Sequence, residues 1–137
     1  MWDSFVQHDN IESIMKDKGL AQIGDNLVNF FYSLAKSVAT SVASGEKVRD
    51  SVLAKAIRAT SVYHHMGRRT DAGRAADAYE AIIAYLWMKD KLDIKDVVRF
   101  LTDRLDIDST TNRKREAEIS SEAFRLLLES ISDRLPQ

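Results

Sequence analysis

The sequence predicts an all-α fold, a single compact domain of about six helices that spans residues 1–137. Residues that interrupt helices are rare, because the chain has only five glycines and one proline, Pro136. Apolar residues recur at three- and four-residue steps, and no segment alternates apolar and polar residues over a sustained length. Since glycine and proline disfavour helix interiors and the helical repeat is 3.6 residues, both observations indicate helices.

The first half of the chain is expected to form three helices. Residues 5–16 have an amphipathic pattern, and residues 23–42 carry a long apolar stripe. We expect the second helix to stop at Gly45, because glycine suits the position after a helix end. Apolar residues at helical spacing recur between residues 47 and 63 and predict the third helix.

The second half of the chain is expected to form three more helices. A basic loop at residues 67–73 precedes a strongly apolar helix at residues 74–88. Residues 93–105 carry a shorter apolar set, and residues 113–134 carry a longer one. The polar connection at residues 106–111 contains aspartate and serine, which suit turns and helix caps. No low-complexity linker and no internal repeat divides the chain, which favours one domain.

The composition favours a cytoplasmic globular protein. Apolar residues make up 45% of the chain and charged residues 30%, and no apolar run reaches the length of a membrane span. The absence of cysteine excludes disulfides, thiolate metal sites and a cysteine nucleophile. The net charge is −1, yet basic residues gather between residues 46 and 74 and at residues 113–115. These local clusters permit a phosphate-binding surface.

Two carboxylates interrupt the strongly apolar segment at residues 76–87. Asp77 and Glu80 are three residues apart, so a helix places them on the same face. The segment contains no lysine within the apolar run and no arginine, and burying ionised carboxylates is costly unless something compensates their charge. A metal ion is one compensator, and an acidic helix edge that faces water is the alternative.

A second acidic segment opens the helix predicted at residues 23–42. There, Gly24 and Asp25 precede a strongly apolar run. Taken alone, Asp25 suits the capping of a helix N-terminus. Together with Asp77 and Glu80, it could converge on one cation, and a set of carboxylate oxygens suits Mg²⁺ or Mn²⁺. Such an ion can bridge to a phosphate and lower the pKa of a bound water.

Both acidic segments resemble the signature motifs of the ribonuclease III catalytic domain. That family has a Gly-Asp pair at the opening of an apolar helix, as in Gly24-Asp25, and an Asp-x-x-Glu element within an Ala/Leu-rich helix, as at residues 77–80. The resemblance is strongest over residues 20–105. The family usually has a glutamate four residues before the signature aspartate, whereas this chain has Ala21.

Residues 20–25, Leu-Ala-Gln-Ile-Gly-Asp, are similar to the signature of the compact Mini-ribonuclease III branch. That branch also lacks the C-terminal domain that binds double-stranded RNA. Asp77, by contrast, is typical of the full-length enzymes. The resemblance therefore implies a stand-alone ribonuclease III-like domain.

The resemblance implies a Mg²⁺-dependent endoribonuclease that cuts double-stranded or structured RNA as a homodimer and leaves a 5′-phosphate and a 3′-hydroxyl. Asp25 and Glu80 would be the main metal ligands, and Asp77 would hold a water on the metal or lie just outside its ligands. Phe30 and Phe31 would lie in the core or at the dimer interface. Phosphate contacts are expected from the basic residues around the second motif, Arg68, Arg69 and Arg74.

Two other functions are compatible with the sequence. Ala21 favours a catalytically impaired module that keeps the fold and binds RNA or the ribosome. An all-α nucleotide pyrophosphohydrolase also holds Mg²⁺ with carboxylates on helices, although such enzymes usually carry a denser Glu-x-x-Glu set. Release of pyrophosphate from nucleoside triphosphates would distinguish this third possibility.

Overall fold

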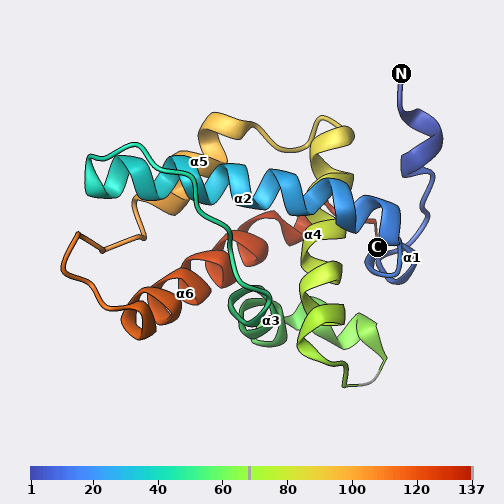
Figure 1. Cartoon of the computed structure of the whole chain (residues 1–137). Helices are drawn as coiled ribbons and strands as arrows, with labels where there is room; N and C mark the ends of the chain where they lie inside the picture. The colour runs from blue at the N-terminus through green and yellow to red at the C-terminus, as the bar shows by residue number, and fades with distance from the viewer. Residues whose placement is uncertain (68, 137) are drawn as a thin grey trace.

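The computed structural model describes residues 1–67 and 69–136 (Figure 1). This part of the chain contains six α-helices, three short 3-10 helices and no strand, which confirms the predicted all-α fold. The α-helices are α1 (Ile11–Met15), α2 (Lys18–Thr40), α3 (Asp50–Arg58), α4 (Ala72–Met88), α5 (Ile94–Thr102) and α6 (Arg113–Ile131). The 3-10 helices are η1 (Asp3–Val6), η2 (Ser61–Met66) and η3 (Ser132–Arg134).

Helix α4 forms the centre of the molecule, and α1, α2 and α3 all pack against it (Figure 1). Every residue from Ala75 to Met88 is buried except Asp77 and Trp87. This burial explains why the sequence of α4 is apolar nearly all the way round, since a helix surrounded by others has no solvent face. Among the described helices, none is both long enough and apolar enough to cross a membrane.

Helix α2 begins at Lys18, so the predicted start at residue 23 was wrong. The Asp17 carboxylate caps the helix by accepting a hydrogen bond from the Leu20 amide at 3.0 Å. Two glycines therefore lie within the helix, although glycine normally disfavours helix interiors. The predicted end was also wrong, because α2 stops at Thr40 and Ser41 adopts a left-handed backbone conformation with φ of 62°.

The helices predicted at residues 5–16 and 47–63 are each divided in the structure. The first becomes η1 and α1, because Asn10 starts a new helix by accepting a hydrogen bond from the Ser13 amide at 2.8 Å. The second becomes α3 and η2, with Thr60 between them in an extended conformation. The predicted α4, α5 and α6 match the structure more closely, and each has an Asp or Asn cap, which the sequence pattern could indicate.

Helix α6 closes the core on the side of α3 and α5. The buried Tyr79 of α4 donates its hydroxyl hydrogen to the Phe124 carbonyl at 2.6 Å, and Ser121 donates to the Val52 carbonyl at 3.2 Å. At the outer end of α6, Glu116 accepts hydrogen bonds from Tyr32 and Lys36 of α2. These contacts fix α3 and α6 relative to the crossing of α2 and α4.

One face of α2 is apolar and remains exposed. Phe31 is fully buried, whereas its neighbour Phe30 is 48% exposed. A core or an interface position was expected for both residues, and the structure assigns only Phe31 to the core. The other large apolar side chains that are exposed on this helix are Ile23, Leu34 and Val38.

Candidate functional site

The backbones of α2 and α4 touch where the two helices cross, and Gly24 makes this contact possible. A Cβ atom placed on Gly24 would lie 1.8 Å from the carbonyl oxygen of Glu80. Only a residue without a side chain fits there. The glycine of the first motif is therefore a packing requirement, and it brings the next residue, Asp25, beside the second motif.

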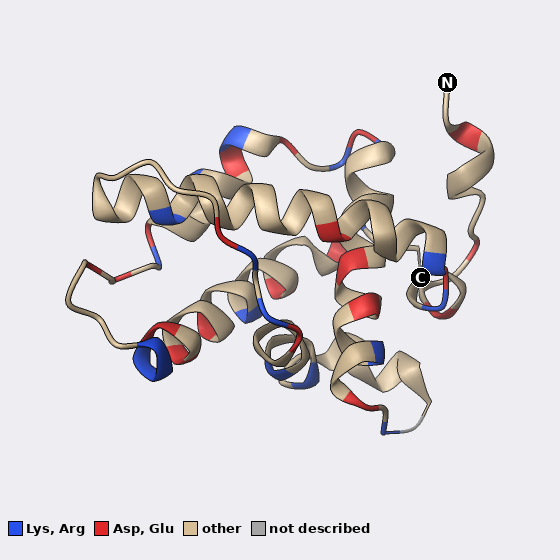
Figure 2. Cartoon of the chain, viewed as in Figure 1, with Lys and Arg blue, Asp and Glu red and all other residues tan. Residues whose placement is uncertain are grey.

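The three predicted acidic residues line one pocket beside this crossing. Asp25 comes from α2, and Asp77 and Glu80 come from α4. Figure 2 shows the acidic bands on α2 and α4 close to the point where the helices cross. The pocket is completed by Lys18, Ala21, Gln22 and Asp50.

Glu80 is the most unusual of these acids, because its residue is only 4% exposed. Burial, together with the nearby carboxylate of Asp25, raises the pKa of Glu80 from 4.5 to about 9. The negative charges of Asp50 and Asp77 act in the same direction. Glu80 is therefore protonated at neutral pH in the metal-free fold, and among the described residues it forms no ion pair. A bound cation would favour its charged form.

Asp77 and Asp25 are more accessible to solvent than Glu80. Asp77 is partly buried, and its pKa is raised first by burial and then by the charge of Asp50. Asp25 is exposed and accepts a hydrogen bond from the side-chain amide of Asn29 at 3.2 Å. The side-chain oxygen of Asn29 in turn accepts from the backbone amide of Val48 at 2.7 Å. Asn29 thus ties Asp25 to the segment that leads into α3.

Asp50 is a pocket residue that neither sequence motif contains. Asp50 is the first residue of α3. Because the helix was predicted to begin at residue 47, Asp50 was expected within the helix and not at its start. A correct helix start would have marked Asp50 as an acid in a first turn, which is a common and non-specific pattern. Only the packing of α3 against α4 places it at the pocket.

The pocket has the donor chemistry of a site for a hard divalent cation. Its acids offer only carboxylate oxygens, which suit Mg²⁺ and Mn²⁺. In the described part of the chain, no three metal-ligating side chains already converge on one point. The exposed Asp25 and Asp50 would therefore have to turn toward a bound ion, whereas Glu80 already lies in the pocket.

The predicted phosphate-binding arginines are only partly placed. Arg68 lies outside the described residues, and Arg69 is exposed in the connection between η2 and α4. Arg74 lines a second depression, which Lys18 and Asp77 share with the acidic pocket. Arg74 is thus adjacent to the acidic pocket, and its role in binding RNA stays a prediction.

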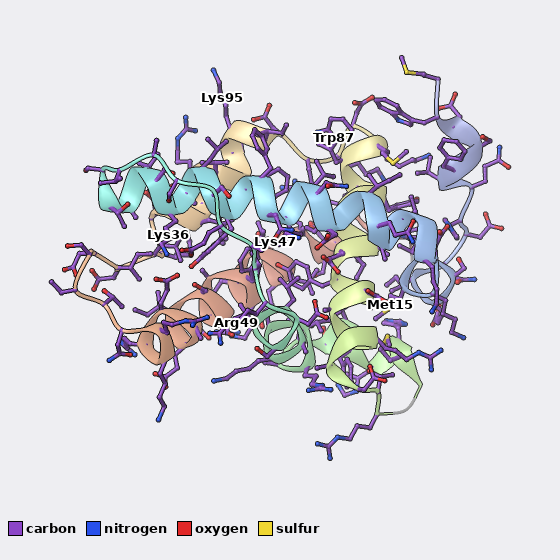
Figure 3. The ribbon with its side chains drawn as sticks, viewed as in Figure 1. Met15, Lys36, Lys47, Arg49, Trp87 and Lys95 are labelled. Atoms are coloured by element: carbon purple, nitrogen blue, oxygen red, sulfur yellow. The ribbon has the colours of Figure 1, made fainter. Side chains whose placement is uncertain are left out.

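Two basic segments that are distant in the sequence meet at the surface that α3 and α6 form. Arg49 and Lys55, at α3, line one depression together with Arg113 and Lys114, at the start of α6. Figure 3 shows Lys47 and Arg49 on the connection that runs from α2 to α3. We refer to Lys47, Arg49, Lys55, Arg113 and Lys114 as the α3–α6 basic surface. Arg49 of this surface is the sequence neighbour of Asp50, so the basic surface begins next to the acidic pocket.

The fold and the site together define an all-helical domain with an acidic pocket between two crossing helices. Residues 18–137 match the protein-family model described as Ribonuclease III. The matched region begins at the first residue of α2 and contains every residue of the acidic pocket. The chain therefore belongs to the ribonuclease III family, whose general function is to cleave RNA. No match is found among curated proteins.

Proposed function

We propose that this protein is a Mg²⁺-dependent endoribonuclease that hydrolyses phosphodiester bonds in double-stranded or structured RNA. The observation that carries the proposal is the buried Glu80 carboxylate, which shares its pocket with Asp25 and Asp77. A purely structural role does not account for Glu80, because a buried acid that holds its proton up to about pH 9 lowers the stability of the fold at neutral pH. The family membership supplies RNA as the class of substrate.

Each pocket residue has a role that follows from its position. Glu80 and Asp25 would hold the divalent ion, with Asp77 beside them. When bound, the ion would supply charge neutralisation for the phosphodiester and acidify the attacking water. Asn29 orients Asp25 through its hydrogen bond, and Lys18 is the pocket's own cation, suited to contact a phosphate oxygen.

The basic surroundings of the pocket support a polyanionic substrate. The α3–α6 basic surface begins at Arg49, next to Asp50, and Lys16 and Arg74 line the depression that shares Lys18 and Asp77 with the pocket. Cations at these positions could follow an RNA backbone through the pocket, because phosphate contacts position a nucleic acid without reading its sequence. Because the whole chain has a net charge of −1, its attraction to an RNA backbone depends on such local clusters of cations.

The first test is cleavage of a long RNA duplex by the purified protein with Mg²⁺ and with EDTA. We expect cutting with Mg²⁺ only, and a loss of about a hundredfold or more in the Glu80→Gln variant. Glu129→Gln is the matched control, since Glu129 is an exposed glutamate of α6 and lies outside the pocket. Gel analysis of the products with end-labelled RNA would give the rates and the end groups.

Binding of the duplex without cleavage would contradict the proposal and favour the impaired RNA-binding module. The structure contains one feature in favour of that alternative, because Ala21 leaves its wall of the pocket without a carboxylate. Cleavage that persists unchanged in Glu80→Gln would show instead that the acidic pocket is not the active site.

We further propose that the protein works as a homodimer and that the exposed apolar face of α2 is the interface. Ile23, Leu27, Phe30, Leu34 and Val38 follow one another at three- or four-residue steps, so they share one side of the helix. All five are exposed or partly exposed. A continuous apolar helix face is typical of a protein contact, and the ribonuclease III resemblance implies a second copy of the chain as the occupant.

Replacing Phe30 with lysine is expected to convert a dimer into a monomer, because a charge would be buried at the centre of the apolar face. Analytical ultracentrifugation at several concentrations would measure the change. The matched control is Ser130→Lys, which places the same charge at an exposed position of α6. A wild-type protein that is monomeric at all concentrations would refute the proposed dimer.

A further inference from the structure

The acidic pocket has an asymmetry that the family pattern does not predict. On the α2 side, the position that usually carries a glutamate is Ala21, which is 4% exposed and lines the pocket. Its methyl group supplies no ligand. A cation held by Asp25 and Glu80 would therefore lack a carboxylate from this wall.

Asp50 lines the same pocket from a different element, the first turn of α3. It therefore shares one depression with Asp25 of α2 and with both acids of α4. Asp50 is exposed, and it belongs to no ion pair among the described residues. Its carboxylate is thus free to turn toward the pocket.

The position of Asp50 is held by the packing around it. Asn29 bonds both Asp25 and the Val48 amide, and Val48 lies two residues before Asp50. The same side chain therefore fixes the carboxylate of α2 and the entry to α3. An aspartate at a helix N-terminus is favourable even without a ligand, because its negative charge interacts well with the helix dipole. A ligand role for Asp50 therefore depends on a second observation.

Glu80 provides that second observation. It lines the pocket, is 4% exposed, and takes part in no ion pair within the described residues, while Asp25, Asp50 and Asp77 line the same pocket. Four acids on one pocket wall, one of them buried, form a donor set that a divalent cation would balance. Lys18 is the one basic residue among the described residues of the pocket wall.

We propose that Asp50 is a ligand of the divalent cation in this pocket and replaces the carboxylate that is missing at Ala21. The inference rests on the proposed metal-dependent function. It makes the site a four-carboxylate set drawn from α2, α3 and α4, although only three of its members belong to the two sequence motifs.

The test is the affinity of the purified protein for Mn²⁺ without RNA, measured by isothermal titration calorimetry. We expect Asp50→Asn to weaken Mn²⁺ binding about tenfold or more. Asp96→Asn is the matched control, because Asp96 is also an acid in the first turn of a helix, on α5 and away from the pocket. Circular dichroism and the melting temperature would confirm that both variants fold.

A rescue experiment separates ligation from a general effect of charge. In the Asp50→Asn background, Ala21→Glu is expected to restore Mn²⁺ affinity, because residue 21 lines the same pocket. Unchanged affinity in Asp50→Asn, with binding lost in Glu80→Gln, would overturn this inference and leave the proposed function intact. No Mn²⁺ binding by the wild-type protein would overturn both. If the rescue variant fails to fold, the comparison of Asp50→Asn with Asp96→Asn still decides.

Discussion

Replacing Gly24 with alanine is expected to destabilise the protein by more than about 3 kcal/mol, above the usual range for overpacking. The new Cβ would lie 1.8 Å from the Glu80 carbonyl oxygen, 2.4 Å from its carbonyl carbon and 2.9 Å from its Cα. All three are backbone atoms of a buried helix, so no side-chain rotation can relieve the clash. The axes of α2 and α4 would have to separate along the largest helix contact of the molecule.

Urea unfolding followed by circular dichroism would measure this change. Gly19→Ala is the matched control, since Gly19 is a glycine of the same helix whose added Cβ would meet only the Asp17 side chain, at 3.4 Å. Alanine is the better helix former, so this control is expected to be neutral or to stabilise by up to about 1 kcal/mol. Similar stabilities for the two variants would show that the helices do not meet at Gly24.

Replacing Glu80 with glutamine is expected to stabilise the metal-free protein at neutral and alkaline pH. The pKa of Glu80 is about 9 in the fold, because of burial and of Asp25, against an ordinary value of 4.5. The folded state therefore holds this proton more tightly than the unfolded state. The contribution of Glu80 to the free energy of unfolding is largest below about pH 4.5 and falls as the pH rises toward 9.

For one such group, the free energy of unfolding changes by at most about 1.4 kcal/mol per pH unit. The test is to measure the free energy of unfolding of the wild-type protein and of Glu80→Gln in EDTA at pH 6, 7 and 8. The other titrating groups are common to both proteins, so their contributions largely cancel in the difference. The groups that face Glu80 are Asp25 and Lys18 of α2, Asp50 of α3 and Asp77 of α4. A constant difference in stability over this pH range would contradict the expectation.

Divalent cations are expected to reverse the advantage of the glutamine variant. Mn²⁺ or Mg²⁺ that binds the folded pocket would raise the melting temperature of the wild-type protein, whereas Glu80→Gln would gain little. Equal shifts in both proteins would place the binding elsewhere on the molecule. Because this measurement needs no RNA, it tests the pocket separately from the choice of substrate.

The two predictions have a common physical basis. Gly24 permits two helices to approach closely, and this approach encloses Glu80 among other acids. The fold therefore stabilises the crossing while it confines negative charge there. Such a combination of tight packing and unfavourable electrostatics is typical of functional sites, where local stability is reduced for the sake of binding.

Much of the fold could be predicted from local patterns. The apolar periodicity predicted the helices, and the near absence of a polar face on residues 74–88 predicted the buried α4. Helix boundaries were less accurate. Asp17 and Asn10 act as caps in the structure, but each is one of several polar residues that precede an apolar run. Which of them starts a helix depends on what the following turns pack against.

The sequence by itself determined the all-α class, the family resemblance and the shared face of Asp77 and Glu80, because these depend on spacing along one chain segment. Only the tertiary structure decided that Asp25 reaches that face, that Asp50 joins it, and that Phe30 is exposed while Phe31 is buried. It also decided why residue 24 is glycine. The physical reason is that these properties depend on how α2, α3 and α4 pack together, and helical periodicity does not specify which helices meet or where.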